Sequence, residues 1–453
     1  MNDHHNDAKS TSNKRENGVD RSVQPTRAIV LTPDFARTPS HTSNRTRTPK
    51  EQLDEALGLA VAIDLDIVAA DIAAISRIAP ATLFTSGKVQ EWAHQVTDLD
   101  AELVIVDYQL TPVQQRNLEK EWNAKVLDRT ALILEIFGRR AQTKEGRLQV
   151  DLAHLNYQRG RLVRSWTHLE RQRGGAGFLG GPGETQIEAD RRILRDKIKK
   201  LEKELEQVRR TRTLHRSKRK KVPLPIVALV GYTNAGKSTL FNRVTGAEVM
   251  AKDMLFATLD PTLRRVKLPG GTWVIMSDTV GFISDLPTHL VAAFRATLEE
   301  VQEADLVLHV RDMSDDQNAA QFDDVNEVLR ELDIDLQDHR VIEVFNKVDL
   351  LKEEARTALA QRAHNASSGS LIAVSAITGE GTNDLLSAVE RKISGQLVHR
   401  DFSIPVERFE DVAWLHENAM VVTRNDNDDG SVDLSVQMST DTARAFEARH
   451  TLN

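Results

Sequence analysis

Residues 231–238 read Gly-Tyr-Thr-Asn-Ala-Gly-Lys-Ser (GYTNAGKS), which matches the phosphate-loop pattern GxxxxGK[ST] at every fixed position. An apolar run over residues 226–230 precedes this stretch, and a helical pattern over residues 239–244 follows it. The flanking strand and helix argue against a chance match, because this order places backbone N–H groups around phosphate oxygens. The predicted nucleotide contacts are Gly231, Tyr232, Thr233, Asn234, Ala235, Gly236, Lys237 and Ser238.

Residues 346–349 read Asn-Lys-Val-Asp and follow the apolar run 341–345. The carboxylate of Asp349 would accept hydrogen bonds from N1–H and the N2 amino group of guanine, a pair that adenine does not offer. An ordinary turn is the alternative reading of this tetrapeptide taken alone. The predicted base contacts are Asn346, Lys347, Val348 and Asp349, with Val374, Ser375 and Ala376 on the other side of guanine.

Residues 278–281, Asp-Thr-Val-Gly, end the apolar run 273–277. Aspartate at this place can bind a metal-bound water, and a glycine N–H can meet the γ-phosphate. A turn between a strand and a helix is the alternative. The predicted contacts are Asp278, Thr279, Val280 and Gly281.

Residues 256–260 fall between the phosphate-loop helix and the next expected strand, where a switch threonine can close on Mg²⁺. Thr258 is preferred over its rival Thr262 because it resembles the family pattern described below. The predicted contacts are Phe256, Ala257, Thr258, Leu259 and Asp260. Lys237, Thr258 and Gly281 are predicted to be catalytic, and Ser238 and Thr258 to bind Mg²⁺.

Phe282 follows the Asp-Thr-Val-Gly motif at the position where Ras-like enzymes carry the glutamine that orients the attacking water. A phenylalanine side chain cannot orient water. We therefore expect slow intrinsic hydrolysis of GTP unless a partner or another residue supplies the missing group. Simple packing of Phe282 under the switch is compatible with this expectation.

The length of the chain, 453 residues, predicts two to four domains. The chain has no cysteine, which excludes disulfides and thiolate metal sites, and no apolar run of about 18 residues that would predict a membrane span. Residues 1–26 are polar and are predicted to be a disordered tail without the apolar stretch of a signal peptide. These features favour a cytoplasmic protein.

Positive charge is concentrated in residues 139–221, which contain 24 Lys and Arg against 10 Asp and Glu. The remaining residues contain 36 and 57, so that a basic segment lies within an acidic chain of net charge −7. Two apolar series with 4,3 spacing, starting at Leu148 and at Ile187, flank the glycine-rich residues 174–183 and predict a helical hairpin with a glycine-rich tip. The charge favours RNA as a partner, although a solvated helical surface would explain it too.

The fold class predicted is α/β, with a parallel-sheet P-loop GTPase domain over residues 222–398. A small α/β domain (27–138) and the basic hairpin with its linker (139–221) precede it, and a small α+β domain (399–453) follows. The predicted strands are residues 28–31, 67–75, 103–106, 226–230, 264–268, 272–277, 306–310, 341–345, 371–374, 402–406, 420–423 and 432–436, and the predicted helices of the first domain are 51–62, 88–96 and 112–122. The acidic residues 426–430 predict a hairpin turn and lack the spacing of a calcium loop.

The chain resembles the HflX family of ribosome-associated GTPases over about residues 27–400. The motifs that carry the resemblance are GYTNAGKSTL (231–240), FATLDPT (256–262), DTVGF (278–282), GPGETQ (181–186) with DRR (190–192), DRT (128–130) with IF (136–137), and EGRLQV (145–150). The resemblance implies binding to the large (50S) ribosomal subunit, GTP hydrolysis stimulated by ribosomes, and a role in splitting stalled ribosomes or in subunit biogenesis. Gly180 departs from the pattern, since many members have a basic residue there.

We therefore expect a monomeric switch that takes GTP as substrate, uses Mg²⁺ and binds the large subunit and its rRNA. Two alternatives stay open. The hairpin could hold a protein partner or a second copy in a non-ribosomal regulator. The chain could also be an RNA-remodelling NTPase with a second nucleotide site, although residues 85–88 (Thr-Ser-Gly-Lys) lack the upstream glycine of a phosphate loop.

Overall fold

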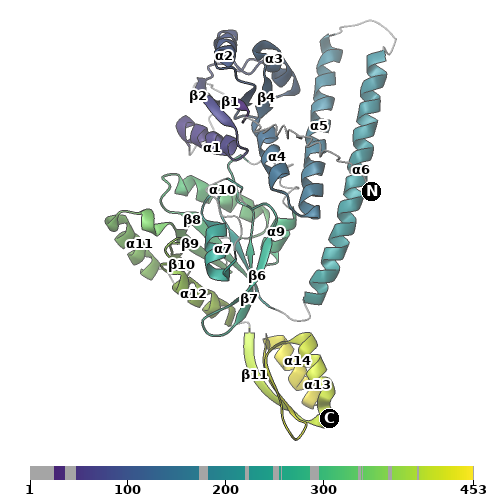
Figure 1. Ribbon diagram of the computed structural model, residues 1–453, viewed down its shortest axis with the longest axis vertical. Coiled ribbons are helices and arrows are strands. Elements are labelled where there is room, and N and C mark those ends of the chain that lie inside the picture. Colours follow the sequence, from purple (N-terminus) through teal and green to yellow (C-terminus); the bar gives the residue numbers. More distant parts are fainter. Residues whose placement is uncertain are drawn as a thin grey trace, which may run out of the picture.

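The computed structural model describes residues 25–35, 47–172, 182–219, 224–247, 255–256, 258–285, 295–334, 338, 340–365, 370–394 and 397–451. Along its long axis lie an N-terminal domain (β1–β4, α1–α4), a central domain (β5–β10, α7–α12) and a C-terminal domain (β11–β13, α13–α14) (Figure 1). The long helices α5 and α6 form a hairpin beside the first two domains. Most of the predicted tail and most of the glycine-rich tip lie outside the described residues.

The N-terminal domain has a four-stranded parallel sheet in the order β2-β1-β3-β4. Its elements are β1 (Arg27–Asp34), α1 (Pro49–Val61), β2 (Asp66–Ala74), α2 (Ser86–Asp98), β3 (Leu103–Val106), α3 (Pro112–Trp122), β4 (Lys125–Asp128) and α4 (Arg129–Arg140). The three strands and three helices predicted here are confirmed, and α3 begins with a capping box made by Thr111 and Gln114. We did not predict β4 and α4, because a four-residue strand leading directly into a largely apolar helix has no clear period.

The hairpin consists of α5 (Lys144–Gln172) and α6 (Pro182–Arg219), which lie side by side (Figure 1). Ile198 and Leu205 of the predicted seam are only 3% and 4% exposed. Asp128 fixes α5 to the N-terminal domain, because it accepts hydrogen bonds from the Tyr157 hydroxyl (2.8 Å) and the Arg161 guanidinium (3.0 Å). The base of the hairpin and the N-terminal domain are therefore held together.

The central domain has a six-stranded sheet in the order β10-β9-β8-β5-β7-β6. Its elements are β5 (Ile226–Val230), α7 (Lys237–Thr245), β6 (Thr262–Lys267), β7 (Trp273–Asp278), α9 (Arg295–Gln302), β8 (Leu306–Asp312), α10 (Asn318–Glu331), β9 (Val341–Asn346), the 3-10 turn η2 (Val348–Leu350), α11 (Glu353–Asn365), β10 (Leu371–Ala373) and α12 (Thr382–Ser394). The parallel strands end at one edge of the sheet, and the predicted phosphate and base motifs follow β5, β9 and β10 at that edge.

One strand departs from the predicted parallel arrangement, since β6 runs antiparallel to β7 at the edge of the sheet. The connection between them is a tight turn, closed by a hydrogen bond from the Leu268 N–H to the Thr272 carbonyl (2.8 Å). Gly271 takes a φ of +98° in this turn. A connection this short can join only antiparallel neighbours, because a parallel crossover needs a dozen or more residues.

The C-terminal domain has an antiparallel sheet in the order β11-β13-β12. Its elements are β11 (Leu397–Ile404), the 3-10 turn η4 (Val406–Arg408), α13 (Phe409–Asn418), β12 (Met420–Asp426), β13 (Val432–Ser439) and α14 (Thr440–Thr451). The predicted hairpin turn is confirmed between β12 and β13, whereas Val406, predicted to end a strand, begins the 3-10 turn. Across the described residues, no helix combines the length and apolar character needed to cross a membrane.

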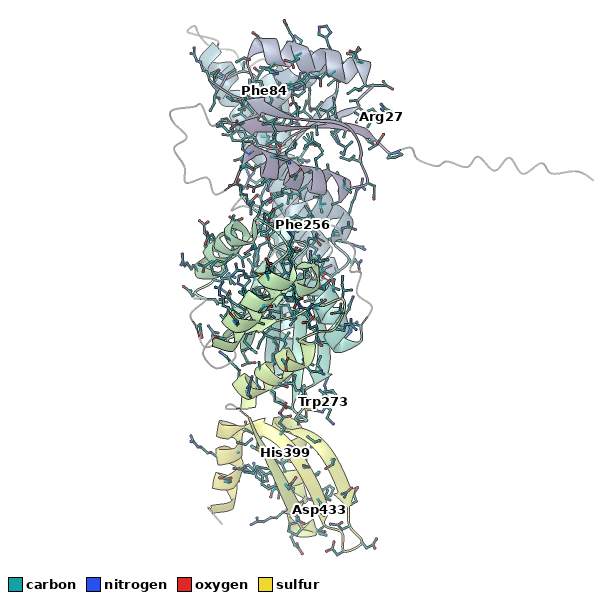
Figure 2. The ribbon with its side chains drawn as sticks, turned by 90° about the vertical axis from the view of Figure 1, so that its left-hand side faces the viewer. Arg27, Phe84, Phe256, Trp273, His399 and Asp433 are labelled. Atoms are coloured by element: carbon teal, nitrogen blue, oxygen red, sulfur yellow. The ribbon has the colours of Figure 1, made fainter. Side chains whose placement is uncertain are left out.

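The N-terminal and central domains share one hydrophobic core. Phe256 marks their junction in Figure 2, and its ring packs edge-on against Phe137 of α4 with the ring centroids 4.9 Å apart. Phe282 and Ile283 belong to the same buried cluster. The predicted switch segments of the central domain are thus packed directly on the N-terminal domain.

Candidate nucleotide site

The phosphate loop lies between β5 and α7 and has the backbone that an anion site needs. Gly231 and Gly236 have φ values of +151° and +89°, and a Cβ on Gly231 would lie 2.1 Å from the Val310 carbonyl oxygen. No side chain caps the start of α7, where Gly236 is the N-cap residue. The first N–H groups of α7, together with the positive end of its dipole, are suited to bind phosphate oxygens.

Lys237 is buried within this loop. Its ammonium group donates to the carbonyl oxygens of Gly231 (3.1 Å) and Tyr232 (2.7 Å). Burial lowers the pKa of Lys237 to about 8, and the neighbouring Asp278 carboxylate offsets part of that effect. A buried cation at this point would gain strongly from an anionic ligand, as β- and γ-phosphates would provide.

Three oxygen atoms meet beside Lys237. The Ser238 hydroxyl lies 2.8 Å from the Thr258 hydroxyl, and the Asp278 Oδ2 accepts from both, at 2.7 Å from Ser238 and 2.9 Å from Thr258. The other Asp278 oxygen, Oδ1, is buried without a hydrogen-bond partner among the described residues. Burial raises the pKa of this carboxyl group, while the Ser238 hydrogen bond and the charge of Lys237 oppose the rise. The site is therefore short of positive charge.

This donor set fits Mg²⁺. Neighbouring ligands of an octahedral Mg²⁺ lie about 2.9 Å apart, since its bonds to oxygen are about 2.0–2.1 Å long. The distance between the Ser238 and Thr258 hydroxyl oxygens, 2.8 Å, matches that spacing. When bound, Mg²⁺ would neutralise charge between the β- and γ-phosphates, and Asp278 would hold one of its waters. Thr262 is the strand partner of Asp278 at the start of β6, whereas the Thr258 hydroxyl lies beside the Ser238 and Asp278 oxygens, so the geometry favours Thr258.

The segment 278–282 lies against the phosphate loop. Thr233 donates its N–H to the Phe282 carbonyl (2.7 Å), and the Phe282 N–H donates to the Gly231 carbonyl (3.1 Å). A Cβ on Gly281 would lie 2.8 Å from Thr233 Cα and 3.1 Å from Lys237 Nζ. Only glycine fits at this position, which faces the place expected for the γ-phosphate. Phe282 is buried in the interdomain core and points no polar group at the site.

The remaining motif residues of this segment are also buried. The hydroxyl of Thr279 donates to the Leu229 carbonyl on β5, and Val280 packs in the same core as Phe282. These two residues fix the segment to the sheet, so that Asp278 and Gly281 are held at the ends of a rigid turn.

Asn346 joins three of the predicted motifs. Its Nδ2 donates to the Ala235 carbonyl of the phosphate loop (2.8 Å), and its Oδ1 accepts from the Ala376 N–H (3.0 Å). The side chain is 1% exposed, and a Cβ on Gly236 would lie 2.2 Å from Nδ2. The phosphate loop, the 346–349 turn and the 374–376 loop are thus held together by one amide group.

The other base-site residues surround the same place. Lys347 takes the left-handed conformation (φ 63°), and its ammonium group pairs with Asp312 at 2.6 Å. Asp349 is the half-buried middle residue of the turn η2, which begins at the buried Val348. Val374, Ser375 and Ala376 are buried beside them. Asp312 was missed because an aspartate at a strand end is not by itself a signal.

The loop 255–260 contacts two regions at once. The Thr258 hydroxyl contacts the Ser238 and Asp278 oxygens, as described above, whereas the Phe256 ring packs on α4. The carboxylate of Asp260 binds the start of α5, where it accepts from the N–H groups of Gln142 and Thr143 (both 2.8 Å) and from the Thr143 hydroxyl (2.6 Å). The side chains of Phe256 and Asp260 therefore contact the domain junction, and the nucleotide contact of this loop stays a prediction. Leu259 is buried in the shared core, and Ala257 lies outside the described residues.

A second polar cluster beside the phosphate loop was not predicted at all. The buried carboxylate of Glu55 on α1 binds Arg47 and Arg129 of the N-terminal domain, and Tyr232 and Ser284 of the central domain. The resemblance drew attention to Arg129 and the phosphate-loop pattern to Tyr232, but no local pattern marks Glu55, Arg47 or Ser284. These contacts join residues up to 229 positions apart in the chain.

A phosphate loop, a predicted guanine-reading turn and a switch threonine on one sheet edge define a P-loop GTPase. The comparisons agree, because residues 226–347 match a family model described as 50S ribosome-binding GTPase. Residues 50–138 and 140–219 match the N-terminal and middle regions of a GTP-binding GTPase, and residues 358–452 match the HflX C-terminal domain. The chain belongs to the HflX family of GTPases and is a GTP hydrolase.

Two curated relatives illustrate the similarity. A protein named GTPase HflX from Magnetococcus marinus is 51% identical, covering 83% of this chain and 86% of that protein. Its counterpart from Escherichia coli strain K12 is 45% identical over 78% and 81% of the two chains. Among solved structures, a GTP-binding protein from Sulfolobus solfataricus in complex with GDP covers 82% of this chain and 99% of its own at 22% identity, with a TM-score of 0.44.

Proposed function

We propose that this GTPase binds the large ribosomal subunit through its basic hairpin, and that bound GTP with Mg²⁺ sets the affinity of this contact. In the proposal, Lys237, Ser238 and the phosphate-loop N–H groups hold the phosphates, Thr258 closes on the metal, Gly281 meets the γ-phosphate and Asp349 selects guanine. The protein acts as a cytoplasmic monomer.

The observation that carries the proposal is the double attachment of the loop 255–260. Thr258 reaches the Ser238 and Asp278 oxygens, while two residues farther along the loop Asp260 accepts three hydrogen bonds from the start of hairpin helix α5. A movement of Thr258 on loss of the γ-phosphate would displace Asp260 too, because only Leu259 lies between them. The nucleotide state would thereby reach the hairpin.

Charge on the hairpin supports RNA as the partner. Arg191, Arg192 and Arg195 line a hollow in the N-terminal part of α6. The buried seam residues Ile198 and Leu205 are covered within a single chain, which favours an intramolecular hairpin over dimerisation. Guanidinium groups bind phosphates in a bidentate manner, so this surface is suited to a folded RNA backbone.

Co-sedimentation with purified large subunits tests the proposal. Binding should be tighter with a non-hydrolysable GTP analogue than with GDP, and it should weaken steeply with salt. Replacing Arg192 and Arg195 with alanine should weaken binding in both nucleotide states, whereas Lys237→Ala should remove only the difference between the states. Equal affinity of the wild type with the analogue and with GDP would refute the switch.

Binding to the large subunit could serve either ribosome splitting or subunit biogenesis, and two assays distinguish these roles. Splitting of intact ribosomes would appear as a loss of light scattering from 70S particles on addition of the GTP-bound protein. A role in subunit biogenesis would instead appear as preferential binding to precursor particles. We favour splitting as the first assay, because it needs only the purified components.

A further inference from the structure

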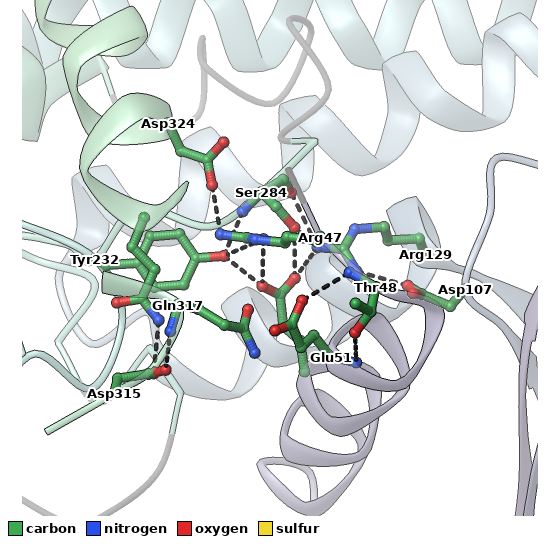
Figure 3. Close-up of polar contacts among 12 residues, drawn as sticks. Arg47, Thr48, Glu51, Asp107, Arg129, Tyr232, Ser284, Asp315, Gln317 and Asp324 are labelled. Atoms are coloured by element: carbon green, nitrogen blue, oxygen red, sulfur yellow. Dashed lines mark hydrogen bonds and ion pairs between the residues drawn. The ribbon is translucent and has the colours of Figure 1, made fainter. Parts of the chain in front are cut away.

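The carboxylate of Glu55 lies at the junction of the N-terminal and central domains with its side chain 10% exposed. Figure 3 shows the side chains of Arg47, Arg129, Tyr232 and Ser284 close together at this junction. Each of these four side chains donates a hydrogen bond to Glu55. Its Oε1 accepts from Arg129 and from the Ser284 hydroxyl (2.7 Å), and its Oε2 accepts from Arg47 (3.0 Å) and from the Tyr232 hydroxyl. Each carboxylate oxygen therefore has two donors.

The charges in this cluster compensate each other. Arg129 also pairs with Asp107 (2.6 Å), and Arg47 also pairs with Asp324 (2.6 Å). Burial would raise the pKa of Glu55, but the charges of Arg129 and Arg47 outweigh it and hold the pKa below its ordinary value. Glu55 is consequently ionised at neutral pH, and its four hydrogen bonds are charge-assisted.

The two central-domain partners of Glu55 are parts of the catalytic region. Tyr232 belongs to the phosphate loop, and Ser284 follows the DTVGF motif by two residues. The Ser284 N–H donates to the Tyr232 hydroxyl (2.8 Å), and Arg129 donates to the Ser284 carbonyl (2.9 Å). Together with the backbone bonds of Phe282, these contacts hold residues 281–284 against the phosphate loop at both ends.

We propose that Glu55 is a positioning residue for GTP hydrolysis, acting through Tyr232 and Ser284 to fix the Gly281 N–H at the γ-phosphate. The glutamine that would orient water in Ras-like enzymes is replaced by the buried Phe282, so the site depends on backbone groups that must be held in place. The N-terminal domain supplies that support from within the same chain. The inference rests on the GTPase activity and not on ribosome binding.

Three single substitutions on the full-length chain test the role without ribosomes. Glu55→Gln, Tyr232→Phe and Ser284→Ala each remove hydrogen bonds of the cluster, and Tyr232→Phe keeps the buried ring. We expect single-turnover GTP hydrolysis to slow by about 10- to 100-fold in Glu55→Gln and in Tyr232→Phe, because small misplacements of a catalytic group have effects of this size. GDP affinity should stay within about twofold, since the phosphate-loop backbone and the base site are unchanged.

The matched control is Asp64→Asn, which also converts a carboxylate paired with an arginine into an amide. Asp64 pairs with Arg139 at 3.1 Å in the same domain, but its side chain is 82% exposed, whereas that of Glu55 is buried. This variant should hydrolyse GTP at the wild-type rate. Thermal unfolding of every variant separates a slower chemical step from a loss of fold.

A double-mutant cycle distinguishes a shared role from separate effects. Glu55→Gln combined with Tyr232→Phe should be no slower than the slower single variant, because both break the same connection. Hydrolysis at the wild-type rate in both Glu55→Gln and Tyr232→Phe would overturn the proposal. Multiplicative effects in the double variant, or an equal loss of GDP affinity and hydrolysis, would overturn it as well. These results leave the large-subunit proposal untouched, since no ribosome is present.

Discussion

Gly146→Ala should disconnect the hairpin from the nucleotide site with little change in overall stability. Gly146 lies in the first turn of α5, and a Cβ there would be 2.2 Å from Asp260 Oδ1 and 3.2 Å from Thr143 Oγ1. The methyl group must displace the Asp260 carboxylate, which holds the start of this helix through three hydrogen bonds. Losing a capping interaction of this kind costs about 1–2 kcal/mol.

Alanine also favours the helix over glycine, by roughly 0.5–1 kcal/mol. The two effects oppose each other, so the free energy of unfolding should fall by no more than about 1.5 kcal/mol. The coupling free energy between Thr258 and the hairpin, in contrast, falls by the whole contribution of the Asp260 contact, because helix propensity does not restore that contact. A loss of 1–2 kcal/mol corresponds to roughly a 5- to 30-fold change in an equilibrium constant.

The assay is the ratio of large-subunit affinities measured with a GTP analogue and with GDP. This ratio should fall by about 5- to 30-fold in Gly146→Ala. Asp260→Ala should lower the ratio by the same factor. Gly160→Ala is the matched control, because it lies in the same helix and its Cβ would meet nothing within 4 Å. An unchanged ratio in Gly146→Ala, or an equal fall in Gly160→Ala, would refute this account of the coupling.

Three further predictions concern the central domain. Lys237→Ala should abolish GTP hydrolysis with the fold intact, as phosphate release and circular dichroism would show, and near-normal turnover would contradict the assigned site. Asn346→Ala leaves the buried Ala235 carbonyl and Ala376 N–H without partners. Calorimetry should therefore show weaker guanine-nucleotide binding, and urea denaturation should show a free energy of unfolding lower by about 2–4 kcal/mol. Undiminished affinity would count against Asn346 as the link between the motifs. Burial, with the charges of Arg311 and Lys237, lowers the pKa of His309 to about 3, so the folded state stays unprotonated while the unfolded state takes up a proton as the pH falls below about 6.5. Wild-type stability should therefore fall by about 1.4 kcal/mol more than that of His309→Phe between pH 7.5 and 5.5, and parallel curves for the two proteins would rule this out.

Local sequence patterns were sufficient for most of the secondary structure near the site. The phosphate loop was predicted because its glycines, lysine and serine follow a strand and begin a helix, and all of these requirements lie within a few residues. The antiparallel β6 was assigned wrongly to a parallel sheet, because strand direction depends on a turn whose hydrogen bond joins Leu268 to Thr272. Short apolar stretches indicate a strand but not its direction.

The roles of single side chains were harder to predict than the elements that carry them. Thr258, Phe256 and Asp260 all belong to one short motif, and its pattern suggested that all three touch the nucleotide site. In the structure the Thr258 hydroxyl contacts the Ser238 and Asp278 oxygens, whereas Phe256 and Asp260 face the N-terminal domain and the hairpin. A conserved-looking motif does not say which neighbour each side chain meets.

The amino-acid sequence alone determined the GTPase class, the hairpin and the residues of the phosphate loop, because steric and hydrogen-bonding demands on a nucleotide act over a few consecutive positions. Only the tertiary structure decided that α1 and α4 press Glu55 and Arg129 against Ser284, and that Asp260 holds the first turn of α5. Contacts between such distant positions depend on how whole domains pack. These contacts form only when the domains pack against each other, and the residues that make them follow no periodic pattern in the sequence.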